Sequence, residues 1–193
     1  MNKVIHIISL IILLICLPVR ATDDLDDLKQ QAWNWLDNEY ERLDSTNRKI
    51  WSYAETSLQE SRSSEQLLGL LRKNGFNVKV GVAGMPTAFV ASYGHASPVI
   101  GILAEFDALP GLSQAANPTP GPGPNPAAGH ACGHSIYGVG SVAAAIAIKR
   151  LIEAGLILGT VRLYGTPAEE TAIGKVYMLR DDYFKQDDVI LKW

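Results

Sequence analysis

The residues best suited to chemistry lie at two places in this sequence, and the first is the tripeptide Cys132-Gly133-His134. A thiolate and an imidazole are standard ligands of Zn²⁺ and similar cations. Because only a flexible glycine separates them, both side chains can turn toward one ion. The pair also fits a simpler interpretation, in which a buried cysteine packs beside a hydrogen-bonded histidine. Taken alone, it only hints at a metal site.

The second place is the pair of adjacent glutamates, Glu169 and Glu170, which follows an apolar segment. Neighbouring carboxylates repel each other, and a cation between them relieves that repulsion. One carboxylate can then bind the ion while the other acts as general base toward water. Two solvated glutamates in the first turn of a helix are the alternative. Asp107 is a candidate to orient a ligand imidazole, whereas His130 suits hydrogen bonding or substrate contact better than metal binding.

The hydrophobic pattern predicts the elements that must position these residues. It indicates helices over 23–43, 45–57, 63–74, 135–154 and 173–180, and strands over 76–82, 87–93, 99–105, 156–164 and from 188 onward. Strands that alternate with helices imply an α/β domain with a partly parallel sheet. Ligand sites in such sheets lie beyond the carboxyl ends of the strands, which is where Asp107 and Glu169 fall.

Residues 115–129 are rich in proline, glycine and asparagine and cannot form a helix or a central strand. Such a composition fits an interdomain linker or a surface loop. Because this segment leads from a strand end into the Cys132 motif, we interpret it as a surface loop that borders an active site.

Composition and the first residues limit the class of protein. With a net charge of −3, a pI of about 5.8 and scattered lysines and arginines, no nucleic-acid partner is expected. An apolar run over 7–17 ends at Pro18, and compact residues precede a cleavage site after Ala21. We therefore expect residues 1–21 to be a signal peptide of a periplasmic or secreted protein that leaves the membrane after cleavage. An uncleaved anchor and a buried core helix are the alternatives. Cleavage leaves Cys132 as the only cysteine, so no internal disulfide can form.

Four motifs in a fixed order are more specific than any of these features alone. They are GMPTAFVA at 84–91, AEFDALPGLSQ at 104–114, GHACGH at 129–134 and GTPAEE at 165–170. From about Asp23 to Trp193 the sequence resembles a family of metallo-amidohydrolases, the aminoacylase- and carboxypeptidase-like enzymes that cleave N-acyl amino acids. Within that family it most resembles the proteins of aminobenzoyl-glutamate utilisation. The resemblance implies a zinc-exopeptidase-like three-layer αβα catalytic domain that binds two divalent ions, Zn²⁺ or Mn²⁺.

The same resemblance implies a role for each site residue. Cys132, His134 and Glu170 would be metal ligands, Glu169 the general base, and Asp107 the carboxylate behind a ligand. The implied reaction is attack of water on the amide carbonyl of aminobenzoyl-glutamate or a related N-acyl amino acid or small peptide. Full-length relatives carry an inserted dimerisation domain and are expected to form homodimers or hetero-oligomers.

The sequence departs from the family pattern at several points. Ser135 stands where relatives usually carry Asp or Asn, and Lys192 stands where many carry His. The remaining ligand histidines of the family are expected beyond Trp193. Residues 22–193 would therefore be a truncated, amino-terminal part of the catalytic domain, and hydrolysis by this chain is expected to be weak or absent.

Two other functions remain open at this point. One is a non-catalytic chain, either a gene remnant or a protein that binds a metal or a partner. The other is a cysteine hydrolase with Cys132 as nucleophile. His134 is badly placed to serve as its base, and the adjacent glutamates would have no role in it.

Overall fold

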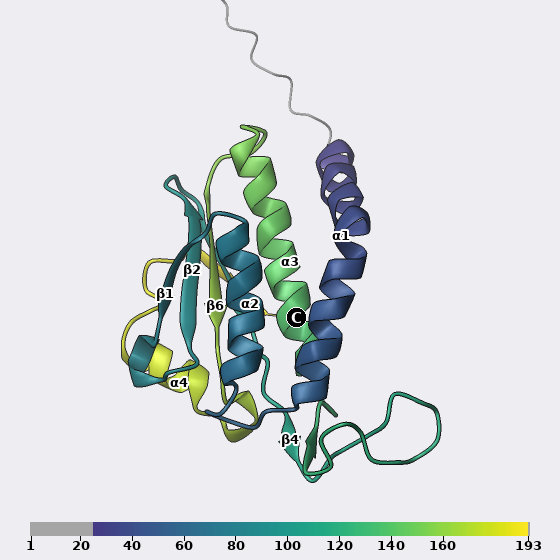
Figure 1. Cartoon of the computed structure of the whole chain (residues 1–193). Helices are drawn as coiled ribbons and strands as arrows, with labels where there is room; N and C mark the ends of the chain where they lie inside the picture. The colour runs from purple at the N-terminus through teal and green to yellow at the C-terminus, as the bar shows by residue number, and fades with distance from the viewer. Residues whose placement is uncertain (1–24, 193) are drawn as a thin grey trace, which may run out of the picture.

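The computed structural model describes residues 25–192, which form a mixed sheet with helices mainly on one of its faces (Figure 1). The helices are α1 (Leu25–Tyr53), α2 (Ser61–Lys73), α3 (His134–Glu153) and α4 (Gly174–Arg180), with the short 3-10 turns η1 (Val82–Gly84) and η2 (Glu169–Thr171). The strands are β1 (Asn77–Val80), β2 (Phe89–Gly94), β3 (Val99–Ala104), β4 (Leu109–Pro110), β5 (Ala128–Gly129), β6 (Thr160–Gly165) and β7 (Val189–Leu191). The signal peptide expected over residues 1–21 lies outside the described residues.

The main sheet has the strand order β1-β2-β6-β3-β7. Strand β6 pairs in parallel with β3 and antiparallel with β2, so the sheet is partly parallel, as the sequence predicts. Ala104 lies beside Gly165 at the carboxyl ends of β3 and β6. The segments that follow these two strands therefore leave the same edge of the sheet side by side.

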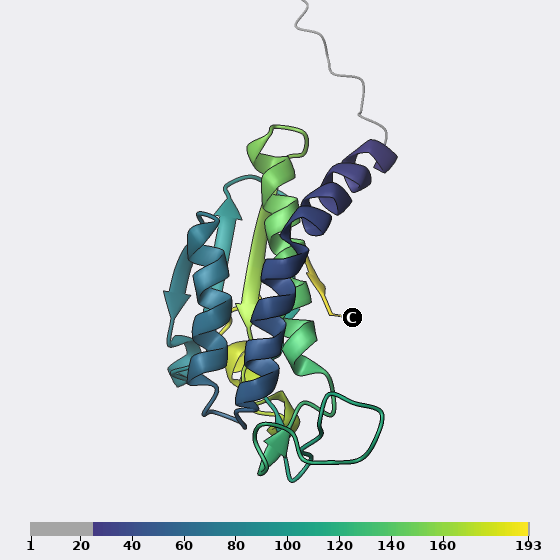
Figure 2. The same cartoon turned by 45° about the vertical axis from the view of Figure 1, so that its right-hand side comes forward.

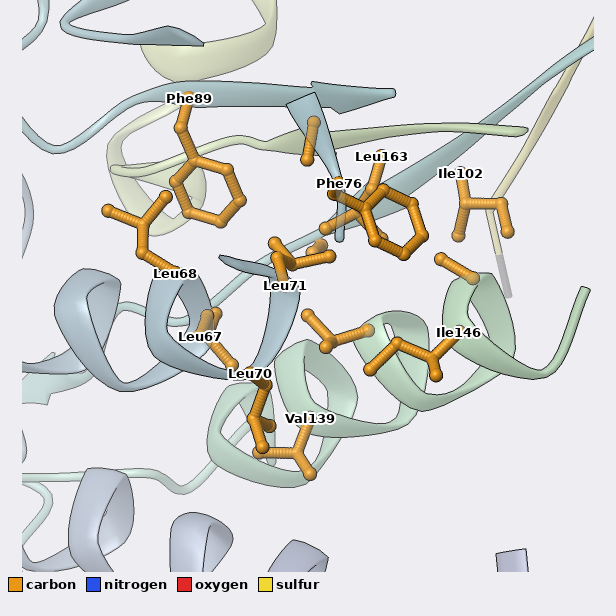
Figure 3. Close-up of a cluster of buried hydrophobic side chains, with 14 of the residues drawn as sticks. Leu67, Leu68, Leu70, Leu71, Phe76, Phe89, Ile102, Val139, Ile146 and Leu163 are labelled. Carbon is orange, nitrogen blue, oxygen red and sulfur yellow. The ribbon is translucent and has the colours of Figure 1, made fainter. Parts of the chain in front are cut away.

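Helices α2 and α3 pack against the sheet, and α1 packs across α3 as an outer layer (Figures 1 and 2). Leu67 and Leu71 of α2, Ile146 of α3, and Ile102 and Leu163 of the sheet are each no more than 1% exposed and belong to one cluster (Figure 3). Burial of a side chain of this size contributes about 1.5–3 kcal/mol. This cluster holds the helices to the sheet.

Helix α3 is long and apolar enough to cross a membrane by length and composition alone. In the structure 56% of its most apolar stretch is buried, because α1 and α2 contact it on one side and β3 and β6 on the other. Ile136 near its start remains exposed. Helix α3 is thus the central helix of the core, in agreement with the burial expected over 135–154.

Helix α1 corrects the sequence prediction, because it continues without a break where two helices were expected over 23–43 and 45–57. No proline or glycine occurs between Leu25 and Tyr53. Asp44, which lies between the two predicted ranges, forms an ion pair with Arg48 along the same helix at 2.7 Å. Helix α1 ends only where Ala54 takes a left-handed conformation, with φ +42°.

The opposite face of the sheet is covered more thinly. Helix α4 and turn η1 contribute Met178 and Val82, which pack with Leu103 and Tyr164 of the sheet. Among the described residues, this short helix and its neighbouring loops form the third layer of the expected αβα arrangement.

The segment 115–129 is a loop, as predicted, except at its end. There β5 pairs with β4 in a two-stranded antiparallel ribbon. The Asn125 side-chain amide donates a hydrogen bond to the carbonyl of Ala54 at 3.2 Å, which ties the loop to the end of α1.

Replacing Leu71 with alanine is expected to lower the free energy of unfolding by about 2–5 kcal/mol, because truncation leaves a cavity between α2 and the sheet. Urea unfolding followed by circular dichroism measures this change. Leu158→Ala is the matched control, since Leu158 is 81% exposed, and it should cost less than about 0.5 kcal/mol. Equal losses in the two variants would contradict the core described above.

Candidate metal centre

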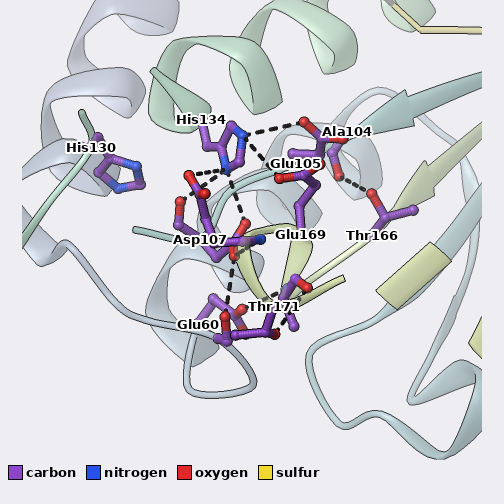
Figure 4. A network of polar contacts seen from close by, with 12 residues as sticks. Glu60, Ala104, Glu105, Asp107, His130, His134, Thr166, Glu169 and Thr171 are labelled. Carbon is purple, nitrogen blue, oxygen red and sulfur yellow. Dashed lines mark hydrogen bonds and ion pairs between the residues drawn. The ribbon is translucent and has the colours of Figure 1, made fainter. Parts of the chain in front are cut away.

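The site lies where β3 and β6 end (Figure 4). Glu105 and Asp107 follow β3 directly. After β6, the backbone N–H and the hydroxyl of Thr166 both donate to the carbonyl of Ala104, at 2.8 and 3.1 Å. These two bonds hold the loop 166–171, which carries the paired glutamates, against the end of β3.

Gly133 sets the directions of the two residues beside it. Its φ of +84° is left-handed, which glycine adopts at little cost, and α3 begins at the next residue. As a result the His134 side chain is buried, whereas Cys132 is exposed. Gly138 lets this end of α3 come close to the sheet, since a Cβ at that position would lie 2.6 Å from the Glu105 carbonyl oxygen.

Potential ligand atoms form two groups, each with all atoms within 4.8 Å of one another. The first group is Cys132, His134 and Glu170, and the second is Glu105, His134 and Glu169. The structure therefore brings together all four residues for which the sequence predicts metal binding or base catalysis. Their individual roles stay predictions.

Asp107 lies behind the imidazole, in the place expected for a supporting carboxylate. Its Oδ1 is 3.0 Å from His134 Nδ1, and its Oδ2 accepts a hydrogen bond from the backbone N–H of Glu170 at 3.0 Å. A proton on Nδ1 bonded to Asp107 leaves Nε2 free to bind a metal. Nε2 faces Glu105 and Glu169, at 3.3 and 3.8 Å. The free nitrogen of the imidazole thus points toward the second group.

Glu105 and Lys175 are residues of the site for which sequence reasoning assigned no role. The Glu105 side chain is buried, and its Oε1 accepts a hydrogen bond from Lys175 Nζ and lies 3.0 Å from Lys192 Nζ. The two ammonium groups also lie 3.5 and 3.7 Å from Glu169 Oε1. Burial alone would raise the pKa of Glu105, but the two lysines outweigh it and lower this pKa. The position of Glu105 after a buried strand was a usable signal, whereas Lys175 reaches the site only through the placement of α4.

Below the pKa of His134, a cation that binds here must displace a proton from Nε2. Burial acts to lower the pKa of His134, but the hydrogen bond and charge of Asp107 and the charge of Glu105 outweigh it. The pKa of His134 therefore lies above its ordinary value of 6.5.

The Cys132 thiol also holds its proton firmly. Burial and the negative charges of Glu170 and Glu169 raise the pKa of Cys132 above its ordinary value of 9.0. Little thiolate is then present near neutral pH without a cation. This environment argues against Cys132 as the nucleophile of a cysteine hydrolase, which needs a depressed thiol pKa.

Metal affinity is therefore expected to rise with pH between about 6 and 9, by up to about tenfold per pH unit for each proton displaced. A raised pKa means that the proton competes until the pH exceeds it, so acidification weakens binding. Titration with Mn²⁺ at several pH values measures the slope. Cys132→Ser should flatten the alkaline part of this dependence, and an affinity that falls with rising pH would contradict the assigned ligands.

His130 lies beside the cluster rather than in it (Figure 4). Its Nε2 is 3.2 Å from the carbonyl oxygen of Ile50, which can only accept, so Nε2 carries the proton. Burial lowers the pKa of His130 to about 4, so the ring is neutral near pH 7. The contact fits the hydrogen-bonding role expected of this residue.

The donor atoms suit a divalent transition-metal ion. Thiolate, imidazole and carboxylate are all zinc ligands, and a set with one imidazole and two carboxylates suits Zn²⁺ or Mn²⁺. Oε1 of Glu170 is buried and has no hydrogen-bond partner within residues 25–192. Because a buried oxygen without a partner is costly, this atom calls for a further group such as a cation.

Comparison with known proteins establishes the family. Residues 101–191 match the profile described as peptidase family M20/M25/M40. The chain is also 41% identical over 174 residues to one of the subunits of the p-aminobenzoyl-glutamate hydrolase of Escherichia coli K12, a match that covers 85% of this chain. The chain carries part of a peptidase family M20 domain. The resemblance drawn from the four sequence motifs is thereby confirmed.

Other relatives of this M20 domain are hydrolases as well. The chain is 30% identical over 179 residues to the Xaa-Arg dipeptidase of Mus musculus, a match that covers 86% of this chain. The alignments cover 35% of the Escherichia coli relative and 38% of the mouse relative. This chain therefore spans just over a third of the length of these curated relatives.

Solved structures confirm the fold class. A Bacillus subtilis protein, described as a dinuclear metal-binding peptidase of the M20 family, matches with a TM-score of 0.68 and 25% identity over 80% of this chain and 42% of that chain. An aminobenzoyl-glutamate utilization protein from Klebsiella pneumoniae matches with a TM-score of 0.61 and 16% identity over 83% of this chain and 45% of that chain. At 16% identity, the match to the Klebsiella pneumoniae protein supports the fold alone.

Proposed function

We propose that this chain carries the metal centre and the general base of a metal-dependent amidohydrolase that cleaves aminobenzoyl-glutamate or a related N-acyl amino acid or small peptide. The observation that carries the proposal is the convergence of Cys132, His134 and Glu170, with Glu169 beside them at the ends of two neighbouring strands. The substrate class is supported by the 41% identity to a protein of the p-aminobenzoyl-glutamate hydrolase.

In the proposed reaction Glu169 takes a proton from the attacking water and passes it to the departing amine. A bound divalent ion would polarise the amide carbonyl and strengthen water as a nucleophile. Asp107 holds the His134 ring through Nδ1, so that Nε2 keeps a fixed direction. Lys175, 3.5 Å from Glu169, offsets the negative charge that gathers there.

Two ions, Zn²⁺ or Mn²⁺, are proposed because two groups of potential ligands lie side by side, and the free Nε2 of His134 would bind one of these ions. Support comes from the Bacillus subtilis relative, which is described as dinuclear. Within residues 25–192 each group offers three ligands and one of these is common to both. Such sparse coordination should hold the ions weakly, so turnover by the 193-residue chain is expected to be slow or absent.

Export is a separate part of the proposal. It rests on the apolar run over 7–17 and the compact residues before a cleavage site after Ala21. Mass spectrometry of the protein recovered from the periplasm or medium should give a mature chain that begins at Thr22. Recovery of an intact amino terminus in the cytoplasm would contradict export.

The activity test uses the purified chain with added Mn²⁺ or Zn²⁺ and aminobenzoyl-glutamate, with product separated by chromatography. Any hydrolysis is expected to be slow, and a chelator should abolish it and added metal restore it. Bound metal without any hydrolysis would favour the non-catalytic, metal-binding alternative. A chain with no affinity for either metal would contradict the proposed function.

A further inference from the structure

The connection between α1 and α2 contains two glutamates with different surroundings. Glu55 accepts hydrogen bonds from the backbone N–H and the hydroxyl of Ser63, at 2.8 and 2.7 Å, and so fixes the start of α2. Glu60 reaches a different part of the chain, because its Oε1 accepts a hydrogen bond from the backbone N–H of Ala168 at 2.9 Å. Figure 4 shows Glu60 at the end of the polar network opposite to His134.

The Glu60 carboxylate is fully buried and held by several donors. Its Oε1 also accepts from the backbone N–H of Leu58 at 2.9 Å, and its Oε2 accepts from the Thr87 hydroxyl at 3.0 Å. A buried carboxylate with three donors has one preferred orientation. The amide of Ala168 therefore meets an acceptor that is fixed in place.

Ala168 needs such a partner for two reasons. Its φ of +58° and ψ of +40° lie in the left-handed region, which is unfavourable for a residue with a Cβ. Ala168 is also fully buried, so water cannot replace the carboxylate as acceptor for its N–H. The bond to Glu60 thus supports a strained residue directly before Glu169.

A second buried carboxylate, that of Asp107, holds the backbone on the other side of Glu169. Oδ2 of Asp107 accepts a hydrogen bond from the backbone N–H of Glu170 at 3.0 Å. Asp107 and Glu60 come from separate segments, and they fasten the amides that immediately precede and follow Glu169.

We propose that Glu60 is a positioning residue that fixes the backbone of the loop 166–171 and so directs the carboxylates of Glu169 and Glu170 toward the metal centre. Glu60 acts through the amide of Ala168 and does not itself bind metal or substrate. The roles of these two carboxylates, Glu169 as base and Glu170 as metal ligand, rest on the proposed function.

Two measurements on the 193-residue chain test this inference. The first is hydrogen exchange of the Ala168 amide in metal-free protein, followed by NMR. The second is affinity for Mn²⁺ and Zn²⁺, measured by competition with a chromophoric chelator. Glu60→Ala removes the acceptor, whereas Glu60→Gln keeps an oxygen for Ala168 and presents an NH₂ to the Thr87 hydroxyl. Glu55→Ala is the matched control from the same connection.

Glu60→Ala is expected to speed exchange of the Ala168 amide at least about tenfold and to weaken metal affinity about 10–100-fold, as loss of a supporting hydrogen bond does at other metal sites. Glu60→Gln should stay within about threefold of the wild type in both measurements. Glu55→Ala should lower the melting temperature and leave both site measurements unchanged. If Glu60→Ala does not fold, Glu60→Asp, which shortens the reach by one methylene, should show the same losses.

An unchanged exchange rate of the Ala168 amide in Glu60→Ala or Glu60→Asp would overturn the inference. Faster exchange without any loss of metal affinity, in a chain that binds metal, would also overturn it. Equal losses in Glu55→Ala would show general destabilisation and overturn it as well. A wild-type chain that binds neither metal would overturn the proposed function. The exchange measurement would then still decide whether Glu60 positions this loop.

Discussion

Replacing His134 with alanine is expected to lower the affinity of the chain for Zn²⁺ or Mn²⁺ by at least about 100-fold, since even the loss of a supporting group commonly costs 10–100-fold. Within residues 25–192, His134 is the residue that belongs to both ligand groups. Its loss therefore removes the one imidazole that the two groups have between them. Isothermal titration calorimetry gives the affinity and the number of ions bound.

His130→Ala is the matched control for this variant. His130 is a second, partly buried imidazole four positions earlier in the chain, and it belongs to neither ligand group. Its removal should leave metal affinity within about threefold of the wild type, because the lost contact is to the carbonyl of Ile50. A His134→Ala chain that binds metal as tightly as the wild type would rule out the metal centre described above.

Replacing Glu169 with glutamine is expected to lower kcat for aminobenzoyl-glutamate at least about 100-fold, because glutamine keeps the shape of the side chain but cannot take a proton from water. Cys132, His134 and Glu170 remain in this variant, so affinity at the first ligand group should be retained. Steady-state hydrolysis, combined with calorimetry on the same preparation, measures both properties. Glu65→Gln on the exposed side of α2 is the control, and it should not change either.

The same experiment separates two roles of Glu169. Its carboxylate is a predicted base, yet it also lies in the group with Glu105 and His134. Loss of one bound ion in Glu169→Gln would assign Glu169 as a ligand of that ion. Hydrolysis that is unchanged in the variant would show that another residue is the base.

The sequence by itself determined the local structure and the edge of the sheet at which chemistry occurs. Alternating and continuous apolar runs predicted strands over 99–105 and 156–164, which end close to Asp107 and to the 166–171 loop. Because residues that follow neighbouring parallel strands must emerge at one edge, Asp107, Glu169 and Glu170 could be placed together without a structure. The tripeptide around Gly133 added Cys132 and His134 by spacing alone.

Helix α1 marks the limit of such local reasoning. Two helices over 23–43 and 45–57 were predicted, whereas the structure has one helix over Leu25–Tyr53. The observed continuity follows from contact with α3 and from the absence of a helix-breaking residue between Leu25 and Tyr53.

Tertiary structure alone decided which groups surround the predicted site residues. Lys175 reaches Glu105 because α4 packs on the opposite face of the sheet, and Glu60 reaches Ala168 from 108 positions away in the chain. Side chains separated by this distance in sequence meet only after the sheet and its connections have formed. The groups that surround the site residues also set the burial and charge that shift the pKa of each one. Neither the orientation of His134 nor the support of Glu169 could therefore be predicted from the spacing of residues in the sequence.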